Sequence, residues 1–131
     1  MRSALRIAVV VLRQIGRRSA LKRGAGDTDI AEQRLVNAER AVRRARINGV
    51  DDADIYYTES SIHALRGDSQ AALESLQSAY ERGFRGIWML KIDLRLESLR
   101  DEPRFVAIEE KINRDIAQAR SEVESITFAA R

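Results

Sequence analysis

Two stretches of the chain, 37–49 and 71–83, carry the same pattern of small and apolar residues 34 positions apart. In this pattern Ala38, Val42, Ala45 and Gly49 recur as Ala72, Leu76, Ala79 and Gly83. A fixed period of about 20–50 residues is typical of repeat architectures, in which each helical hairpin buries one face against its neighbours. Small residues at such contacts let helix backbones approach closely. The period therefore predicts stacked antiparallel helical hairpins, which present a surface to another molecule.

The composition favours helices over sheets. One proline and seven glycines interrupt 131 residues, and 33% of the residues are charged. The chain is long enough for one domain with a real core. It contains no cysteine, which excludes disulfides and thiolate metal sites and is compatible with a reducing compartment. We therefore expect an all-α protein located in the cytoplasm.

The charge is unevenly distributed. Residues 1–24 carry seven basic groups and no acidic group, which gives +7, whereas the remainder carries −4. Residues 2–19 can be drawn as an amphipathic helix whose basic stripe is Arg2, Arg6, Arg13 and Arg17. Three roles stay open for this stripe: contact with anionic lipid, which would place the protein at the periphery of a membrane, contact with nucleic-acid phosphates, or packing on the acidic body.

Local signals divide the chain into a basic segment with its hinge (1–26), a helical domain (27–126) and a tail (127–131). Gly24–Gly26 is expected to be the hinge, and Asp27 to Asp29 to start the first helix of the domain. The expected helices and helical turns cover 29–48, 52–66, 69–82, 86–99 and 101–126. Asp51 or Asp52, Asp93 and Asp101 are expected to cap helices, with Pro103 in the first turn of the last one.

The core is expected to form where the second hairpin packs. Leu76 lies between two alanines and should fill the gap to the partner helix, on which Ser60 supplies a small residue. Tyr80 is expected to pack against Trp88. The last helix shows a clean spacing of three and four residues. Its apolar positions are Phe105, Ile108, Ile112, Ile116, Ala119 and Val123.

Three strings carry a resemblance to a known family: Ala64-Leu65-Arg66-Gly67-Asp68, Ala79-Tyr80-Glu81-Arg82-Gly83 and Leu99-Arg100-Asp101-Glu102-Pro103-Arg104-Phe105. They resemble the closing tetratricopeptide segment found at the C-terminus of bacterial winged-helix transcription factors, class III cyclases and serine/threonine kinases. The resemblance is close over a third of the chain. It implies a short right-handed solenoid of antiparallel hairpins, with a long C-terminal helix as its cap. One departure is Glu59, where the repeat normally carries leucine, so this position is expected to be less buried.

The polar constellations favour structural roles. Glu59 and His63 lie four residues apart, but the chain has only one histidine and no third ligand is apparent. The tripeptide at Arg66–Asp68 is interpreted as a tight turn between helices. Glu109, Glu110 and Asp115 are interpreted as a solvated helix face. We therefore expect no catalytic residue, metal, cofactor or small-molecule substrate.

The repeat frame places Asp54, Tyr57, Thr58 and Ser61 on the concave side of the solenoid. A groove with an acid, an aromatic ring and two hydroxyls suits a peptide, with Tyr57 as the anchor; an ordinary wet surface is the alternative. We expect a non-enzymatic adapter or scaffold that binds a protein or peptide, with self-association at its exposed apolar edges. The alternative function is a regulatory or targeting subunit of a separate enzyme or transcription regulator, docking on membrane or nucleic acid through the basic helix.

Overall fold

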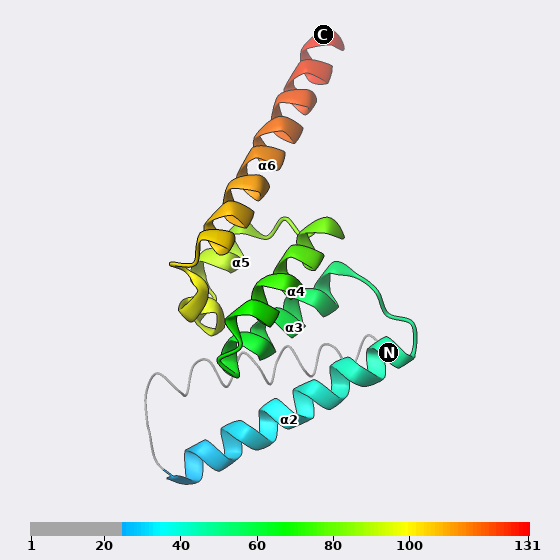
Figure 1. Cartoon of the computed structure of the whole chain (residues 1–131). Coiled ribbons are helices and arrows are strands. Elements are labelled where there is room, and N and C mark those ends of the chain that lie inside the picture. The colour runs from blue at the N-terminus through cyan, green and yellow to red at the C-terminus, as the bar shows by residue number, and fades with distance from the viewer. Residues whose placement is uncertain (1–24) are drawn as a thin grey trace.

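The computed structural model describes residues 25–131, and every element in this range is helical. The elements are α2 (Ala25–Ile47), α3 (Ala53–Leu65), α4 (Ser69–Glu81), α5 (Ile87–Ile92), the 3₁₀ helix η1 (Leu94–Leu99) and α6 (Pro103–Ala129). Short turns join consecutive helices, so α3 and α4 form an antiparallel hairpin, with α2 lying against α3 (Figure 1). The prediction of an all-α chain is confirmed.

The helices that carry the 34-residue pattern, α2 and α4, end in the same way. Gly49 and Gly83 both have positive φ, +85° and +100°, a conformation that glycine adopts without steric cost. The amide of the next residue donates to the carbonyl five residues back in both cases, from Val50 to Ala45 at 3.0 Å and from Phe84 to Ala79 at 2.9 Å. This is the Schellman ending of a helix. The sequence repeat therefore corresponds to a repeat of backbone geometry.

The alanines of the pattern lie at helix contacts. Ala38 and Ala45 belong to a cluster between α2 and α3, whereas Ala72 and Ala79 belong to a cluster on the other side of α3. All four are buried. The hydroxyl of Ser60 donates to the carbonyl of Ala72 over 2.7 Å, which satisfies a polar group at the point where α3 and α4 meet. The expected close approach at these small residues is thus confirmed.

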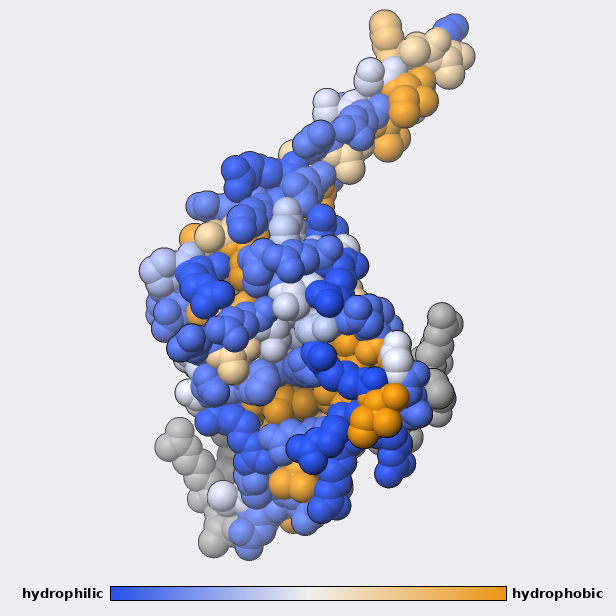
Figure 2. Space-filling model, turned by 45° about the vertical axis from the view of Figure 1, so that its right-hand side comes forward, coloured by the Kyte–Doolittle hydropathy of each residue, from blue (hydrophilic) through white to orange (hydrophobic). Residues whose placement is uncertain are grey.

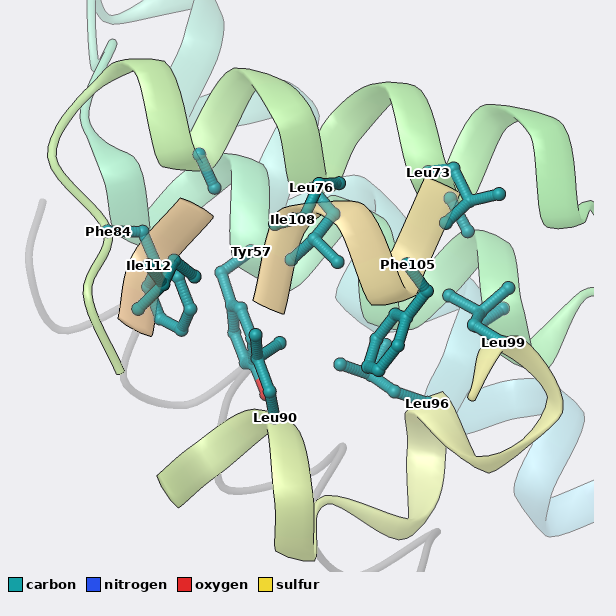
Figure 3. Close-up of a cluster of buried hydrophobic side chains, with 13 residues drawn as sticks. Tyr57, Leu73, Leu76, Phe84, Leu90, Leu96, Leu99, Phe105, Ile108 and Ile112 are labelled. Atoms are coloured by element: carbon teal, nitrogen blue, oxygen red, sulfur yellow. The ribbon is translucent and has the colours of Figure 1, made fainter. Parts of the chain in front are cut away.

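The larger cluster draws side chains from five elements (Figure 3). Leu76 of α4 is fully buried, and the apolar residues of α5, η1 and the first half of α6 cover the hairpin from the other side. The ten large side chains of this cluster are Tyr57, Leu73, Leu76, Phe84, Leu90, Leu96, Leu99, Phe105, Ile108 and Ile112. The prediction that 86–99 forms two short helical turns against the repeat is confirmed, with Asp93 capping the second turn through Arg95 N at 3.1 Å.

The last helix extends well beyond the body. Pro103 stands in its first turn, as expected, and Phe105, Ile108 and Ile112 are buried. The expected apolar face also included Ala119 and Val123, but both are exposed, because the hairpin against which α6 packs ends before them. Figure 1 shows this second half of α6 projecting from the rest of the molecule.

Several expected boundaries differ from the structure. Ala25 and Gly26 belong to α2, so the helix starts before Asp27 and these two residues are not part of a hinge. Glu102, not Asp101, occupies the N-cap of α6, and no side chain caps that end. The expected boundary at residue 126 falls inside α6. Asp52, one of the two capping candidates, does cap α3 by accepting from Ile55 N at 3.0 Å. The residues at which a basic helix was expected, 2–19, lie outside the described part of the chain.

Candidate interaction surface

The structure buries most of the groove that the sequence predicted. Asp54 is exposed, but Tyr57, Thr58 and Ser61 are buried, at 5%, 2% and 0% exposure. The hydroxyls of Thr58 and Ser61 donate to carbonyls of their own helix, those of Asp54 and Tyr57. The prediction of Tyr57 as an exposed anchor is therefore wrong. The physical reason is that η1 folds back along α3 and contacts it closely, which a repeat pattern within one hairpin does not show.

Tyr57 instead belongs to a buried polar cluster centred on Asp93. Its ring stacks on Phe84 with centroids 4.6 Å apart, and its hydroxyl donates to Asp93 Oδ2 over 2.7 Å. The Arg95 guanidinium binds the same carboxylate at both oxygens, through Nε at 2.7 Å and through Nη2. The Asp93 and Arg95 side chains are only 10% and 6% exposed. The cluster fixes the turn between α5 and η1 on α3.

Burial and charge set the ionisation of this cluster. Burial alone would raise the pKa of Asp93, but the hydrogen bonds and charge of Arg95, with the Tyr57 hydroxyl, outweigh it and hold the pKa below its ordinary value of 3.8. Burial raises the pKa of Tyr57, and the negative charge of Asp93 raises it further. Tyr57 is therefore a neutral donor and Asp93 a charged acceptor at neutral pH.

Replacing Tyr57 by phenylalanine should weaken the body without disturbing the stacking on Phe84. The variant removes one donor from a buried carboxylate, so we expect the free energy of unfolding to fall by about 1–3 kcal/mol in urea denaturation. Tyr56→Phe is the matched control, because its hydroxyl donates to Asp51 at an exposed site, over 2.8 Å. Equal decreases in the free energy of unfolding of the two variants would show that the buried hydrogen bond to Asp93 stabilises the protein no more than the exposed one to Asp51.

The other polar residues that the sequence singled out hold helices together. Glu59 is largely covered and accepts both bonds of a bidentate pair from Arg46, which joins α2 to α3. Arg66 binds Glu32 and Glu39 of α2, and the following Gly67 has a φ of +79°, so the Arg66–Asp68 turn is confirmed. Within residues 25–131 no group of three potential ligands lies close enough to hold a metal ion.

Asp115 joins α6 to α4. Its Oδ2 accepts from the Tyr80 hydroxyl at 2.7 Å and pairs with Arg85 at 2.9 Å, while the Arg85 guanidinium lies over the Tyr80 ring. The expected position of Asp115 on a solvated face is thus only partly correct, since its carboxylate is engaged. Tyr80 is held to α6 by its bond to Asp115, whereas Trp88, its expected partner, is largely exposed.

Trp88 is free of the core and marks an exposed apolar patch. It is 74% exposed, and Ile92, one helical turn further along α5, is 70% exposed, so the two share the outer face of this helix. The ammonium group of Lys91 lies 5.6 Å from the centre of the Trp88 ring. We call the patch of exposed large apolar residues on α5 and at the start of η1 the α5 patch; its members are Trp88, Met89, Ile92 and Leu94.

Sequence reasoning missed the α5 patch because it predicted two short helical turns at 86–99 folded over the repeat, without deciding which of their apolar residues face solvent. One signal was present. Eight large apolar residues occur within these 14 positions, more than one face of two short turns can bury, so some had to face solvent. The structure directs Leu90, Leu96 and Leu99 inward and leaves the four patch residues outside.

The remaining predicted contacts, Arg2, Arg6, Arg13 and Arg17, lie outside the described residues. In the part of the chain that is described, no helix combines the length and the apolar character that crossing a bilayer requires. Comparison of the chain with protein-family models, with curated proteins and with solved structures finds no match.

Proposed function

We propose that this chain is a protein- or peptide-binding module of tetratricopeptide type that acts as an adapter or scaffold. Two features of the body support the repeat assignment. The helices α2 and α4 end with the same hydrogen bonds, and the repeated alanines lie at helix contacts. Hairpins that stack through such contacts form rigid extended surfaces, and proteins of this kind commonly use these surfaces to bind other proteins.

The observation that carries the proposal is the α5 patch. Exposed apolar residues scattered singly are normal, but four large ones within the seven positions 88–94, beside a folded core, favour an interaction site. Tryptophan contributes strongly to protein interfaces, because it buries a large rigid area and keeps an N–H donor. The neighbouring Lys91 adds a positive charge, so a segment with apolar side chains and an adjacent carboxylate fits the patch best.

Affinity capture from native lysate, quantified by mass spectrometry, tests this assignment. We expect the double variant Trp88→Ala, Ile92→Ser to lose captured proteins by about tenfold or more, since an anchor in an interface typically contributes 2 kcal/mol or above. Its thermal stability should stay near that of the parent chain, because both side chains are exposed.

Ile47→Ser is the control, because Ile47 is also a large exposed apolar residue, at 79% exposure, but lies at the end of α2 and outside the α5 patch. It should capture the same proteins as the parent chain. Undiminished capture by the double variant would remove the α5 patch as the site. Equal loss in both variants would show that the captured proteins bind apolar surface without selectivity.

A further inference from the structure

The second half of α6 carries an apolar face that the body does not cover. Ile112 is buried and Ile116 is half-buried, but Val123 and Ile126 are 62% and 69% exposed. Figure 2 shows apolar side chains along one edge of this projecting helix. The positions of the face are Ile112, Ile116, Ala119, Val123, Ile126 and Ala130, spaced by four and three residues in alternation. We propose that α6 pairs in antiparallel orientation with α6 of a second copy of this chain.

The local sequence shows that this part of α6 needs a partner. From Ala117 to Ala129 the helix extends about 20 Å at 1.5 Å per residue. Isolated helices of this length are marginal in water even when rich in alanine. Here Val123, Ile126 and Thr127 are β-branched and lower the helix propensity further. A continuous helix to Ala129 is therefore explained best when its apolar face is covered.

The spacing identifies the partner as a helix of the same kind. An alternation of three and four residues has a mean period of 3.5, which keeps an apolar seam facing one partner helix in a left-handed coiled coil. In the described part of the chain, the apolar faces of α3 and α4 are already used in the core clusters. The free seam is continuous with the buried stripe at Phe105, Ile108 and Ile112, so a second copy offers a seam of matching period.

The position of the body decides the orientation. The apolar seam runs along one side of α6. In the first half of the helix, at Ile108 and Ile112, this side packs on the helix's own body, and beyond residue 116 the same side is free. A parallel partner on this seam would bring its body into the same space, whereas an antiparallel partner places the two bodies at opposite ends. A parallel coiled coil would also pair Asp115 with Arg120 of the other chain, but Asp115 is engaged by Tyr80 and Arg85.

Charge decides the register. Each seam has two flanks, one on either side of the apolar positions. In an antiparallel pair of identical helices, each flank of one helix lies beside the same flank of the other helix. A register with Ala119 opposite Val123 would set Arg120 against Arg120, and Glu122 against Glu122, of the two copies. The register shifted by one heptad sets Val123 opposite Ile126, and Ala119 opposite Ala130. Arg120 then meets the flank that carries Thr127 and Glu124 of the second copy, which removes both like-charge contacts.

Light scattering during size exclusion measures the association. We expect the parent chain to be a dimer at ~100 μM that dissociates on dilution, because only two large side chains per copy are buried. Val123→Glu with Ile126→Glu should raise the dissociation constant by at least ~100-fold, since each layer would then oppose two carboxylates. Phe128→Glu is the control, because Phe128 is 83% exposed but lies on the other side of the helix, and it should leave the dimer unchanged.

Cysteine pairing tests the orientation, since the chain has no cysteine of its own. Ala119→Cys and Ala130→Cys are at exposed positions, so both variants should fold. On oxidation we expect a disulfide-linked dimer only when the two variants are mixed. A parallel pair would instead link Ala119→Cys with itself.

A parent chain that stays monomeric at this concentration, or a dimer that Phe128→Glu disrupts as strongly as the double glutamate variant, would overturn the proposal. Crosslinking of Ala119→Cys with itself would refute the antiparallel orientation. The proposed binding function is separable, because Trp88→Ala with Ile92→Ser leaves the seam intact and should keep the dimer even if it loses every captured protein.

Discussion

Replacing Asp93 by alanine is expected to lower the free energy of unfolding by about 3–5 kcal/mol, because it leaves the guanidinium of Arg95 buried without its counter-charge. The Arg95 side chain is 6% exposed and places two donors on the Asp93 carboxylate. The same substitution removes the acceptor of the Tyr57 hydroxyl and the cap of η1. Urea denaturation followed by circular dichroism measures the loss.

Asp68→Ala is the control for the loss of a cap alone. Asp68 is exposed and caps α4 by accepting from Ala71 N at 3.0 Å, so its loss should cost about 0.5–2 kcal/mol. The amount by which the loss of stability in Asp93→Ala exceeds that in Asp68→Ala then measures the effect of leaving Arg95 buried without its partner. Adding Arg95→Met to Asp93→Ala should recover part of the stability, because the unpaired charge is gone. Equal losses in Asp93→Ala and Asp68→Ala would mean that the pair has no net effect.

The same pair predicts an acid dependence. The folded pKa of Asp93 lies below its ordinary value of 3.8, so the unfolded chain binds the proton more readily. The stability that Asp93 contributes is therefore complete above pH ~4 and is lost as the pH falls through the folded pKa. Asp93→Ala should show a smaller loss of stability on acidification below pH ~4 than the parent chain does.

The features that were predicted correctly from the sequence are those that depend on residues close together along the chain. A Schellman ending needs glycine at one position and an apolar residue nearby, so the ends at Gly49, Gly67 and Gly83 could be located from local signals. The 34-residue period identified Ala72 and Ala79 as contact residues, since small residues at a fixed interval indicate close helix approach. Local chemistry was sufficient for these features.

The failures came from contacts between distant segments. Tyr57 and Asp93 are 36 positions apart, and no pattern within α3 shows that η1 will cover the face that carries Tyr57. The periodicity of α6 correctly indicated an apolar face that includes Val123, but periodicity does not show where the body that covers this face ends. Trp88 was expected to pack against Tyr80, and only the burial of Leu90 on the same short helix shows which face of that helix is outside.

Leu76→Ala is expected to destabilise the body by about 2–5 kcal/mol, the range for a fully buried leucine. Leu76 lies between Ala72 and Ala79 on α4 and faces Ile108 of α6 within the large cluster (Figure 3). Truncation removes apolar contacts and leaves a cavity, and its size depends on how far the neighbours relax. Leu76 is fully buried in a cluster to which several elements contribute, so we expect a value in the upper half of this range.

Two further variants define what this measurement means. Glu74→Ala on the same helix is exposed and should change stability by no more than about 0.5 kcal/mol. Val42→Ala alters the equivalent position of the preceding repeat, where the side chain is smaller and fewer elements meet, so its loss should be smaller than that of Leu76→Ala. If the second hairpin is the centre of the stack, Leu76→Ala should also weaken the packing of α6 on α4, since both helices share this cluster. A loss near zero for Leu76→Ala would contradict the position of the core between the repeated alanines, and the repeat assignment would lose its support.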